Sequence, residues 1–205
     1  MGCVQLLKDD RQTPELKKRL VGILSRESGR VDAIVKDFLD FARPGEPKRE
    51  RCYLPSLAED LEASWEMDLR AEGLPLAMEE PPAVWIETDP VGFHRTLTNL
   101  LANARKAVAE ARRPEVGLGF RLSGPNLWVT VRDNGCGMDA ERLRTLYVPF
   151  ASGFEEGTGL GLSLVYQFTQ SMGWEIQVES ALGKGTRVRL SLPVLADPAV
   201  PSLAR

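Results

Sequence analysis

The stretch VTVRDNGCGM, residues 129–138, decides the fold class, because an alternating apolar pattern runs straight into an acidic, glycine-rich turn. Val129 and Val131 alternate with polar residues, as in a half-buried β-strand. A carboxylate at the strand end, Asp133, can accept a hydrogen bond from an exocyclic amine, and the bare backbone of Gly135 and Gly137 lets a flat ring approach. Taken alone, D-x-G-x-G is as compatible with an ordinary tight turn. It lacks the further acids and the distal Glu of a calcium loop.

A second glycine-rich stretch, GTGLGL (157–162), runs directly into a helical pattern over residues 160–172. Glycines before a helix N-terminus expose backbone N–H groups at the positive end of the helix dipole, which favours binding of phosphate. The Gly-Lys-Ser/Thr ending of a Walker loop is absent, and no strand leads into the stretch as in a dinucleotide fingerprint. A third stretch, GKGT (183–186), opens the last strand, and by itself a simple hairpin explains it equally well.

The helical stretch before the central strands carries a polar row of its own, within NLLANARKA (99–107). Asn99, Asn103 and Lys106 recur at i, i+4 and i+7 and therefore share one helix face. Amide oxygens are hard neutral ligands for hydrated Mg²⁺, and a lysine adds a point charge for phosphate. Alone this is a weak signal, because exposed asparagines are more often simply solvated.

The remaining pattern predicts an α+β domain. We expect helices over residues 54–71, 90–110 and 160–172, and strands over residues 83–88, 116–122, 127–132, 174–180 and 186–192. The domain therefore covers residues 54–194, after a polar linker over residues 45–53 and before a Pro- and Ala-rich flexible tail over residues 195–205.

The N-terminal 44 residues predict a helical hairpin. Residues 1–10 are typical of the end of a helix. A second helix then begins at Thr13 as N-cap, with Pro14 at its first position. Apolar residues recur at alternating spacings of three and four as far as Phe41, the pattern of a bundle or coiled coil. About 28 residues make a rod of roughly 40 Å. Its apolar stripe needs more cover than a ten-residue partner supplies. Either the chain dimerises or part of its bundle lies outside this chain; the other alternative is a long surface helix that lies across its own domain. We expect a homodimer through residues 1–43.

Composition narrows the class of protein further. The 205 residues carry 26 Lys and Arg against 29 Asp and Glu, a net charge of −3, which does not favour a nucleic-acid partner. No run approaches the ~20 apolar residues of a membrane span, and the N-terminus has no secretory signal. Three scattered cysteines suit a reducing compartment. We therefore expect a cytoplasmic chain.

Together these stretches resemble the ATP-binding domain of sensor histidine kinases. That domain is a branch of the GHKL family, which includes DNA gyrase and the 90-kDa heat-shock chaperones. NLLANARKA resembles the N box, DNGCGM the G1 box, VPF (148–150) the F box, GTGLGL the G2 box and GKGT the G3 box, in the family's order. The resemblance covers residues 52–194. It implies a two-layer α/β sandwich, a mixed sheet of about five strands covered by three helices.

The resemblance also implies ATP and Mg²⁺ as cofactors and assigns a role to each matching residue. Asn103 would ligate Mg²⁺, supported by Asn99, and Lys106 would touch phosphate. Asp133 would hold the adenine amino group, with Thr186 supporting it. The glycines of the G1 box would line the base pocket, and those of the G2 box would close on the phosphates. The implied ATP-binding residues are Asn99, Asn103, Lys106, Asp133, Gly135, Gly137, Phe150, Gly157, Thr158, Gly159, Leu160, Gly161, Leu162 and Thr186.

Two positions refine the implied activity. ATP-hydrolysing relatives carry a Glu four residues before the Mg²⁺-ligating Asn, as the base for water, and this chain has Asn99 there. The site should therefore hold ATP for transfer and hydrolyse it poorly. The only histidine, His94, lacks the acidic neighbour and following proline of a phosphoacceptor motif.

The resemblance extends to the helical segment and implies the partners. Residues 27–44 resemble the second helix of the dimerisation and phosphoacceptor hairpin of sensor kinases, so we expect the acceptor histidine upstream of Met1. A response regulator receiver domain would then take the phosphoryl group, and a sensor domain would precede the hairpin. The resemblance also implies that the full-length protein can be membrane-anchored, as sensor kinases often are. The alternative is a histidine-less GHKL protein that acts as a regulator or phosphotransfer scaffold.

Overall fold

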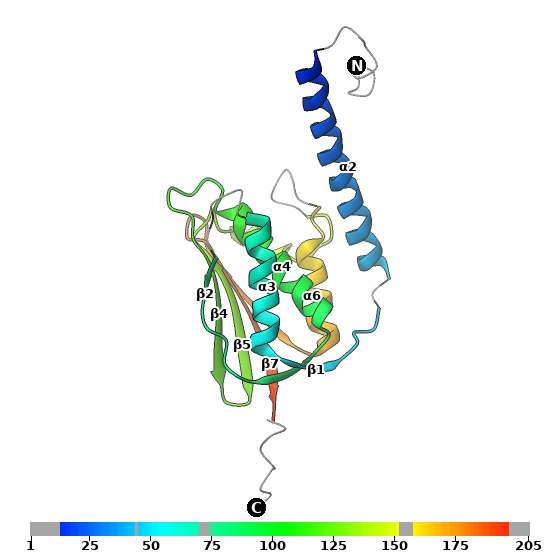
Figure 1. The fold of residues 1–205 in the computed structure, drawn as a ribbon. Coiled ribbons are helices and arrows are strands. Elements are labelled where there is room, and N and C mark those ends of the chain that lie inside the picture. Colours follow the sequence, from blue (N-terminus) through cyan, green and yellow to red (C-terminus); the bar gives the residue numbers. More distant parts are fainter. Residues whose placement is uncertain (1–12, 44, 70–73, 75, 152–157, 197–205) are drawn as a thin grey trace, which may run out of the picture. The chain divides into compact units, whose positions relative to one another are not determined.

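The computed structural model describes residues 13–43, 45–69, 74, 76–151 and 158–196. The chain divides into two compact units, Met1–Pro44 and Gly45–Arg205 (Figure 1), and each is described by itself. The predicted helix end over residues 1–10 and most of the predicted C-terminal tail lie outside the described residues.

The first unit contains one long helix, α2, Pro14–Ala42. Thr13 is its N-cap, and the hydroxyl oxygen of Thr13 accepts a hydrogen bond from the N–H of Leu16 at 3.3 Å. Large apolar side chains stay exposed along α2, including Val31, Phe38 and Leu39, of which 48–56% is accessible. The helix matches the predicted length, and these apolar side chains stay exposed among the described residues.

The second unit is built on a mixed seven-stranded sheet, with the strand order β1-β3-β7-β5-β4-β2 and with β6 also paired to β7. All pairs are antiparallel except β2 with β4. The strands are β1 Glu50–Tyr53, β2 Leu76–Met78, β3 Trp85–Thr88, β4 Val116–Ser123, β5 Asn126–Asp133, β6 Glu175–Ser180 and β7 Thr186–Leu195.

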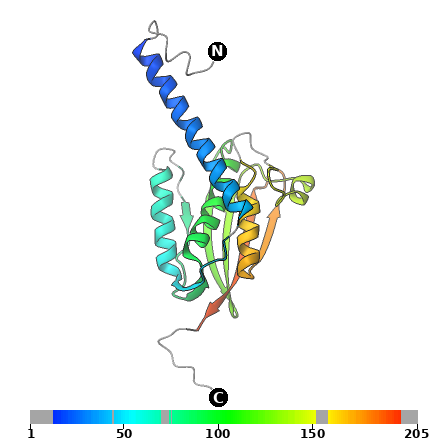
Figure 2. The ribbon, with the colours of Figure 1, turned by 90° about the vertical axis from the view of Figure 1, so that its right-hand side faces the viewer.

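Three helices cover one face of this sheet, as Figures 1 and 2 show: α3 Leu54–Leu69, α4 Pro90–Ala107 and α6 Gly161–Met172. The strands alternate as the sequence predicts, so Leu127, Val129 and Val131 of β5 point into the core while their neighbours point away. On α4 the row Leu97, Leu100, Leu101 and Ala104 is buried, which turns Asn99 and Asn103 to a different side. The predicted α+β sandwich is confirmed.

The structure adds elements that the sequence pattern misses. Strand β1 lies inside the segment predicted as a linker, β2 and the short helix α5 Ala140–Arg144 were not expected, and the sheet has seven strands rather than about five. These pieces are three to five residues long, too short for a periodic pattern. Helix α4 also ends three residues early, because the carbonyl of Ala107 accepts the N–H of Cys136 at 3.0 Å from the G1 box.

Candidate functional site

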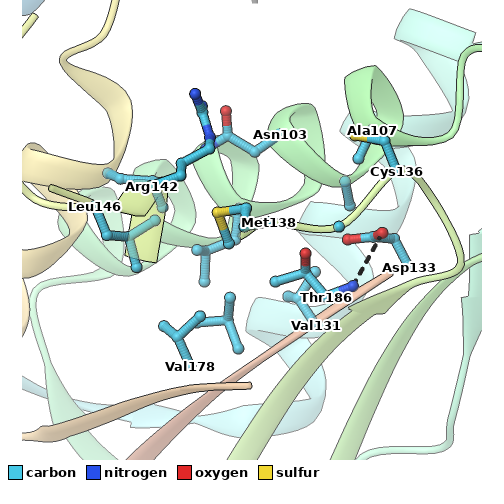
Figure 3. Close-up of a pocket in the computed structure, with 15 residues that line it drawn as sticks. Asn103, Ala107, Val131, Asp133, Cys136, Met138, Arg142, Leu146, Val178 and Thr186 are labelled. Carbon is cyan, nitrogen blue, oxygen red and sulfur yellow. Dashed lines mark hydrogen bonds between the residues drawn. The ribbon is translucent and has the colours of Figure 1, made fainter. Parts of the chain in front are cut away.

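A pocket opens between α4 and the β5–β7 region of the sheet, and its volume is about 760 Å³ including the open mouth. Its walls are mostly apolar, and a few polar groups point into it, as in other small-molecule sites. Helix α4 contributes Asn103, and the sheet contributes Asp133 and Thr186 (Figure 3). The lining residues are Leu100, Asn103, Ala104, Ala107, Val131, Asp133, Cys136, Gly137, Met138, Arg142, Leu146, Leu162, Val178, Thr186 and Val188.

Asp133 is the carboxylate of this pocket, and the backbone around it holds it in place. It is the last residue of β5, where it pairs with Val116 of β4 and Thr186 of β7. Its Oδ1 accepts a hydrogen bond from the N–H of Gly135 at 2.8 Å. The same oxygen accepts the N–H of Thr186 at 3.2 Å, the dashed line in Figure 3. Burial raises the pKa of Asp133 above its ordinary value, and the two hydrogen bonds oppose that rise. The side chain is therefore a fixed, partly desolvated acceptor.

The glycines of the G1 box let this loop pass between two neighbours. A side chain at Gly135 would place its Cβ 2.2 Å from the carbonyl oxygen of Ala107 on α4. At Gly137, where φ is +64°, a Cβ would lie 2.0 Å from the carbonyl oxygen of Ala181. Between them, Cys136 bonds through its backbone to Ala107 and Gly183. Only bare backbone fits here, so the loop forms a thin wall of the pocket.

Thr186 belongs to a hydrogen-bonded group on the same side of the sheet. Its hydroxyl lies 2.9 Å from that of Ser180, directly opposite on β6. The Ser180 hydroxyl donates to the carbonyl of Gly185 at 3.0 Å and accepts the N–H of Met138 at 2.9 Å. These bonds connect the G3 turn to the end of the G1 box behind Asp133.

The N-terminus of α6 meets the polar row of α4. A Cβ placed on Gly161 would lie 3.6 Å from Oδ1 of Asn99 and 3.9 Å from Nδ2 of Asn103. No side chain caps α6, whose N-cap is Leu160. Two carboxamides thus face uncapped backbone N–H groups, which suits binding of phosphate.

The residues before α6 are tied to the F box. The N–H of Phe150, which has φ +65°, donates to the carbonyl of Gly159 at 3.0 Å, and a Cβ on Gly159 would lie 2.6 Å from the backbone of Phe150. The Thr158 hydroxyl accepts the N–H of Leu160 at 3.2 Å. These contacts bring the F and G2 boxes together.

The structure therefore gathers five of the implied ATP-binding residues around one pocket: Asn103, Asp133, Gly137, Leu162 and Thr186. Asn99, Gly135 and Gly161 adjoin it through the contacts above, whereas Leu160 is fully buried and Phe150 is 60% exposed. Lys106 lies one turn beyond Asn103 without lining the pocket, and Gly157 lies outside the described residues.

Sequence reasoning missed one charged residue of the pocket, Arg142. It lies on α5, whose N-cap Asp139 accepts the Arg142 N–H at 2.8 Å. Asp139 followed by Glu141 was the available signal for a helix start.

His94 lies apart from the pocket lining, at the contact between α4 and α3. Its Nε2 is 3.1 Å from the hydroxyl of Ser64, and its Nδ1 is 3.4 Å from the hydroxyl of Thr98. Both ring nitrogens are engaged, as in a structural histidine.

Comparison with known proteins agrees with this geometry. The family model described as "Histidine kinase-, DNA gyrase B-, and HSP90-like ATPase" matches residues 88–196, more than half of the chain. The chain belongs to this ATPase family. The matched region contains every element that lines the pocket.

Sensor kinases are among the curated relatives of this member of the family. Sensor histidine kinase ZraS of Klebsiella oxytoca is 31% identical over 178 residues, covering 86% of this chain and 38% of the relative. Sporulation kinase E of Bacillus subtilis (strain 168) is 29% identical over 197 residues, covering 94% of this chain and 26% of the relative. The chain thus spans less than half of these two relatives.

Solved structures show the same fold. The full-length kinase ShkA, solved with AMPPNP, has a TM-score of 0.73 at 24% identity and covers 96% of this chain and 42% of its own. The catalytic domain of histidine kinase ThkA has a TM-score of 0.62 at 21% identity, and the match covers 71% of this chain and 95% of the ThkA chain. Within the described residues, no helix is long and apolar enough to cross a membrane.

Proposed function

We propose that this chain is the ATP-binding catalytic part of a two-component sensor histidine kinase. It would transfer the γ-phosphate of ATP to a histidine outside these 205 residues, for relay to a response regulator. The observation that carries the proposal is the pairing of a fixed carboxylate, Asp133, with the carboxamide of Asn103 in one apolar pocket. Such a pocket can hold the base of a nucleotide at one end and its phosphates at the other.

The adenine end of the site would be the sheet side. The Asp133 carboxylate accepts the exocyclic amine of adenine, and the ring lies against the bare G1 backbone and the apolar wall. Thr186 keeps Asp133 in place through its N–H. Because Asp133 is fixed before the nucleotide arrives, binding orders little of the protein.

The phosphates would lie between α4 and the N-terminus of α6. The described residues contain no cluster of three His, Cys, Asp or Glu side chains that could hold a metal alone. Mg²⁺ fits this site because it binds through few protein ligands together with substrate phosphates, and Asn103 offers a hard amide oxygen. The ion would neutralise the phosphate charge that develops during transfer. Asn99 supports Asn103, and Lys106 and the G2 glycines contact the phosphates.

Asn99 also distinguishes transfer from hydrolysis. Neither carboxamide can take a proton from water at neutral pH, so among the described residues no general base stands beside the phosphates. ATP would therefore remain intact until an acceptor approaches. His94 is a poor acceptor, because Ser64 and Thr98 already engage its ring.

The partners follow from the same proposal. The exposed apolar side chains of α2 would pair with a second copy of the chain as part of a four-helix bundle. The structure of ThkA bound to the response regulator TrrA, with a TM-score of 0.74 to this chain at 21% identity, supports a receiver domain as the second partner. A sensor domain elsewhere in a longer protein would supply the signal.

Nucleotide protection of Cys136 tests the site directly. Cys136 is exposed and lines the pocket, whereas Cys52 is half-buried and burial raises its pKa. With Cys3 and Cys52 replaced by Ser, a thiol reagent should label Cys136, and ATP with Mg²⁺ should slow the labelling at saturation. Asn103→Ala should remove the Mg²⁺-dependent protection, and the matched control Gln170→Ala, an exposed carboxamide on α6, should retain it.

Transfer is tested separately, with labelled ATP and a helical hairpin that carries a phosphoacceptor histidine. Labelled hairpin supports the kinase. Protection of Cys136 without transfer would favour the alternative, a histidine-less regulator or scaffold. Unchanged labelling at all ATP concentrations would contradict the site itself.

A further inference from the structure

The face of the sheet turned away from the helices carries a second charged pocket. On β5 the side chains of Trp128, Thr130 and Arg132 point to this face, and on β7 those of Arg187 and Arg189 do so. Within this unit, helices α3, α4 and α6 all lie on the other side of the sheet (Figures 1 and 2). These three helices therefore leave the face open.

This face carries several arginines, although the unit as a whole has more acidic than basic residues. Residues 45–205 carry 17 Lys and Arg against 22 Asp and Glu. Four arginines from three adjacent strands share this one face: Arg121, Arg132, Arg187 and Arg189. The acids on the same face are Glu175 and Glu179 of β6 and Glu79, whose carboxylate lies over Gly119.

An open pocket of about 750 Å³ lies at one end of the face. Its charged lining residues are three cations, Arg132, Lys184 and Arg187, and two acids, Asp133 and Glu179. Arg132 and Arg187 are direct partners in the register of β5 and β7. Like charges directly opposite each other destabilise a sheet. The arrangement therefore costs stability unless something anionic compensates for it.

The two arginines point apart. The Arg132 side chain lies flat over Gly117 of β4, with its Nε 2.8 Å from the position that a Cβ there would take. Arg187 points instead toward Glu179 of β6, with its Nη1 3.6 Å from the carboxylate. This is the conformation that repulsion favours, and it leaves space between the two guanidinium groups.

The charges of the pocket are incompletely paired. The described residues give Arg132 and Lys184 no acidic partner within ion-pair distance. Glu179 has a second arginine, Arg189, which also binds it. If Arg187 moves away from Glu179, that carboxylate therefore remains paired with Arg189.

We propose that this pocket binds a phosphate dianion between Arg132, Lys184 and Arg187. A carboxylate would need only one of the three cations, whereas a dianion matches the two unpaired charges and can draw in the third. Arginine binds phosphate in a bidentate geometry, and lysine adds a compact charge. The phosphate is either free or part of a phosphomonoester.

The pocket borders the ATP pocket at the ends of β5 and β7, where Asp133 and Thr186 line both. Its cations differ from the residues of the ATP pocket, because successive residues of a strand face opposite sides of the sheet and Arg132 therefore points away from the side to which Asp133 points. The inference does not depend on the proposed kinase function, because none of its three cations belongs to the nucleotide site.

NMR of the arginine Nε–Hε groups in the full chain tests the proposal. Sodium phosphate is compared with sodium chloride at matched ionic strength, and glycerol 2-phosphate serves as the monoester. Arg132 and Arg187 should shift saturably with phosphate. Arg121, on the same face but outside the pocket, should not. If glycerol 2-phosphate binds more tightly than inorganic phosphate, the natural ligand is a phosphate group on a larger molecule. If the two bind equally, it is the free anion. Both results support the site.

Variants make the test specific. Arg132→Gln and Arg187→Gln should each weaken phosphate binding at least tenfold, whereas the matched control Arg121→Gln should stay within twofold of wild type. Lys184→Gln, in an exposed turn, gives the same test without touching the sheet. No saturable shift, or an equal loss in Arg121→Gln, would overturn the proposal. Loss of the response in Asn103→Ala would assign the phosphate to the nucleotide pocket instead.

Discussion

Replacing Asp133 by Asn should separate nucleotide binding from stability, because the two properties depend on its charge in opposite directions. The Asn carbonyl can still accept both N–H groups, from Gly135 at 2.8 Å and Thr186 at 3.2 Å. What the variant loses is the negative charge toward the adenine amine. A hydrogen bond with one ionised partner contributes about 1.5–3 kcal/mol, so ATP affinity should fall roughly 10- to 150-fold.

Stability should change the other way. Burial raises the pKa of Asp133 above 3.8, which means that the empty pocket disfavours its charged form. A carboxyl group with a raised folded-state pKa stabilises the fold only at low pH, and that contribution is lost as the pH rises through the raised value. The Asn variant pays no such penalty, so without nucleotide it should equal or exceed the wild type in stability at pH 7.5. The advantage should shrink toward pH 4.

Two measurements check this prediction. Calorimetric titration gives the affinity for ATP and for GTP, whose base carries a carbonyl in place of the amine. Because Asn can donate as well as accept, the variant should lose much of its preference for ATP. Urea unfolding at pH 7.5 and pH 4, with the two proteins compared at each pH, isolates the contribution of this one group. Normal ATP binding by the variant would refute the reasoning. So would a stability difference, variant minus wild type, that is smaller at pH 7.5 than at pH 4.

Three further predictions concern other parts of the chain. Gly135→Ala forces a Cβ against the Ala107 carbonyl, so it should cost about 1–3 kcal/mol of unfolding free energy and weaken nucleotide binding. Gly45→Ala, with open space around it, is the control in the urea-unfolding assay. Equal stabilities of the two variants would count against the close approach at Gly135. Asp89→Ala removes both acceptor oxygens, Oδ1 for the N–H of Gly92 and Oδ2 for that of Lys48, each at 2.9 Å, and should cost about 1–2 kcal/mol in the same assay. Asp89→Asn keeps one acceptor oxygen, so it should lose only part of that stability. Phe38→Asp should shift sedimentation of the full chain toward monomer, and a wild type that is already monomeric would contradict pairing through α2.

Much of the pocket could be predicted because its residues sit at strand ends and helix starts with strong local signals. Asp133 follows an alternating strand, and the G2 glycines precede an apolar helix, so both positions follow from short-range pattern. The N-cap of α4 was not singled out, although Asp89 followed by Pro90 is a standard start signal. Most of the correct predictions therefore rest on short-range sequence patterns.

The missed features depend on contacts distant in the sequence. Strand β1 has only four residues, two of them charged, and it exists because it pairs with β3 some 35 residues later. Arg51 then stacks over Trp85 at 5.5 Å, a contact that no pattern within β1 foretells. Arg142 likewise enters the pocket only because the G1 loop turns α5 toward it. Tertiary pairing decides such elements, and a single sequence does not display it.

The register of β5 explains how one strand can serve two opposite faces. Eight consecutive residues of β5 pair with β4 and with β7, so the strand is held on both sides along its whole length. A slip by one residue would turn Arg132 into the apolar pocket and Asp133 onto the open face, exchanging the charges of both sites. The slip would also expose Leu127, Val129 and Val131, which are now almost fully buried. Hydrophobic burial therefore fixes the register, and the register in turn decides which charge faces which ligand.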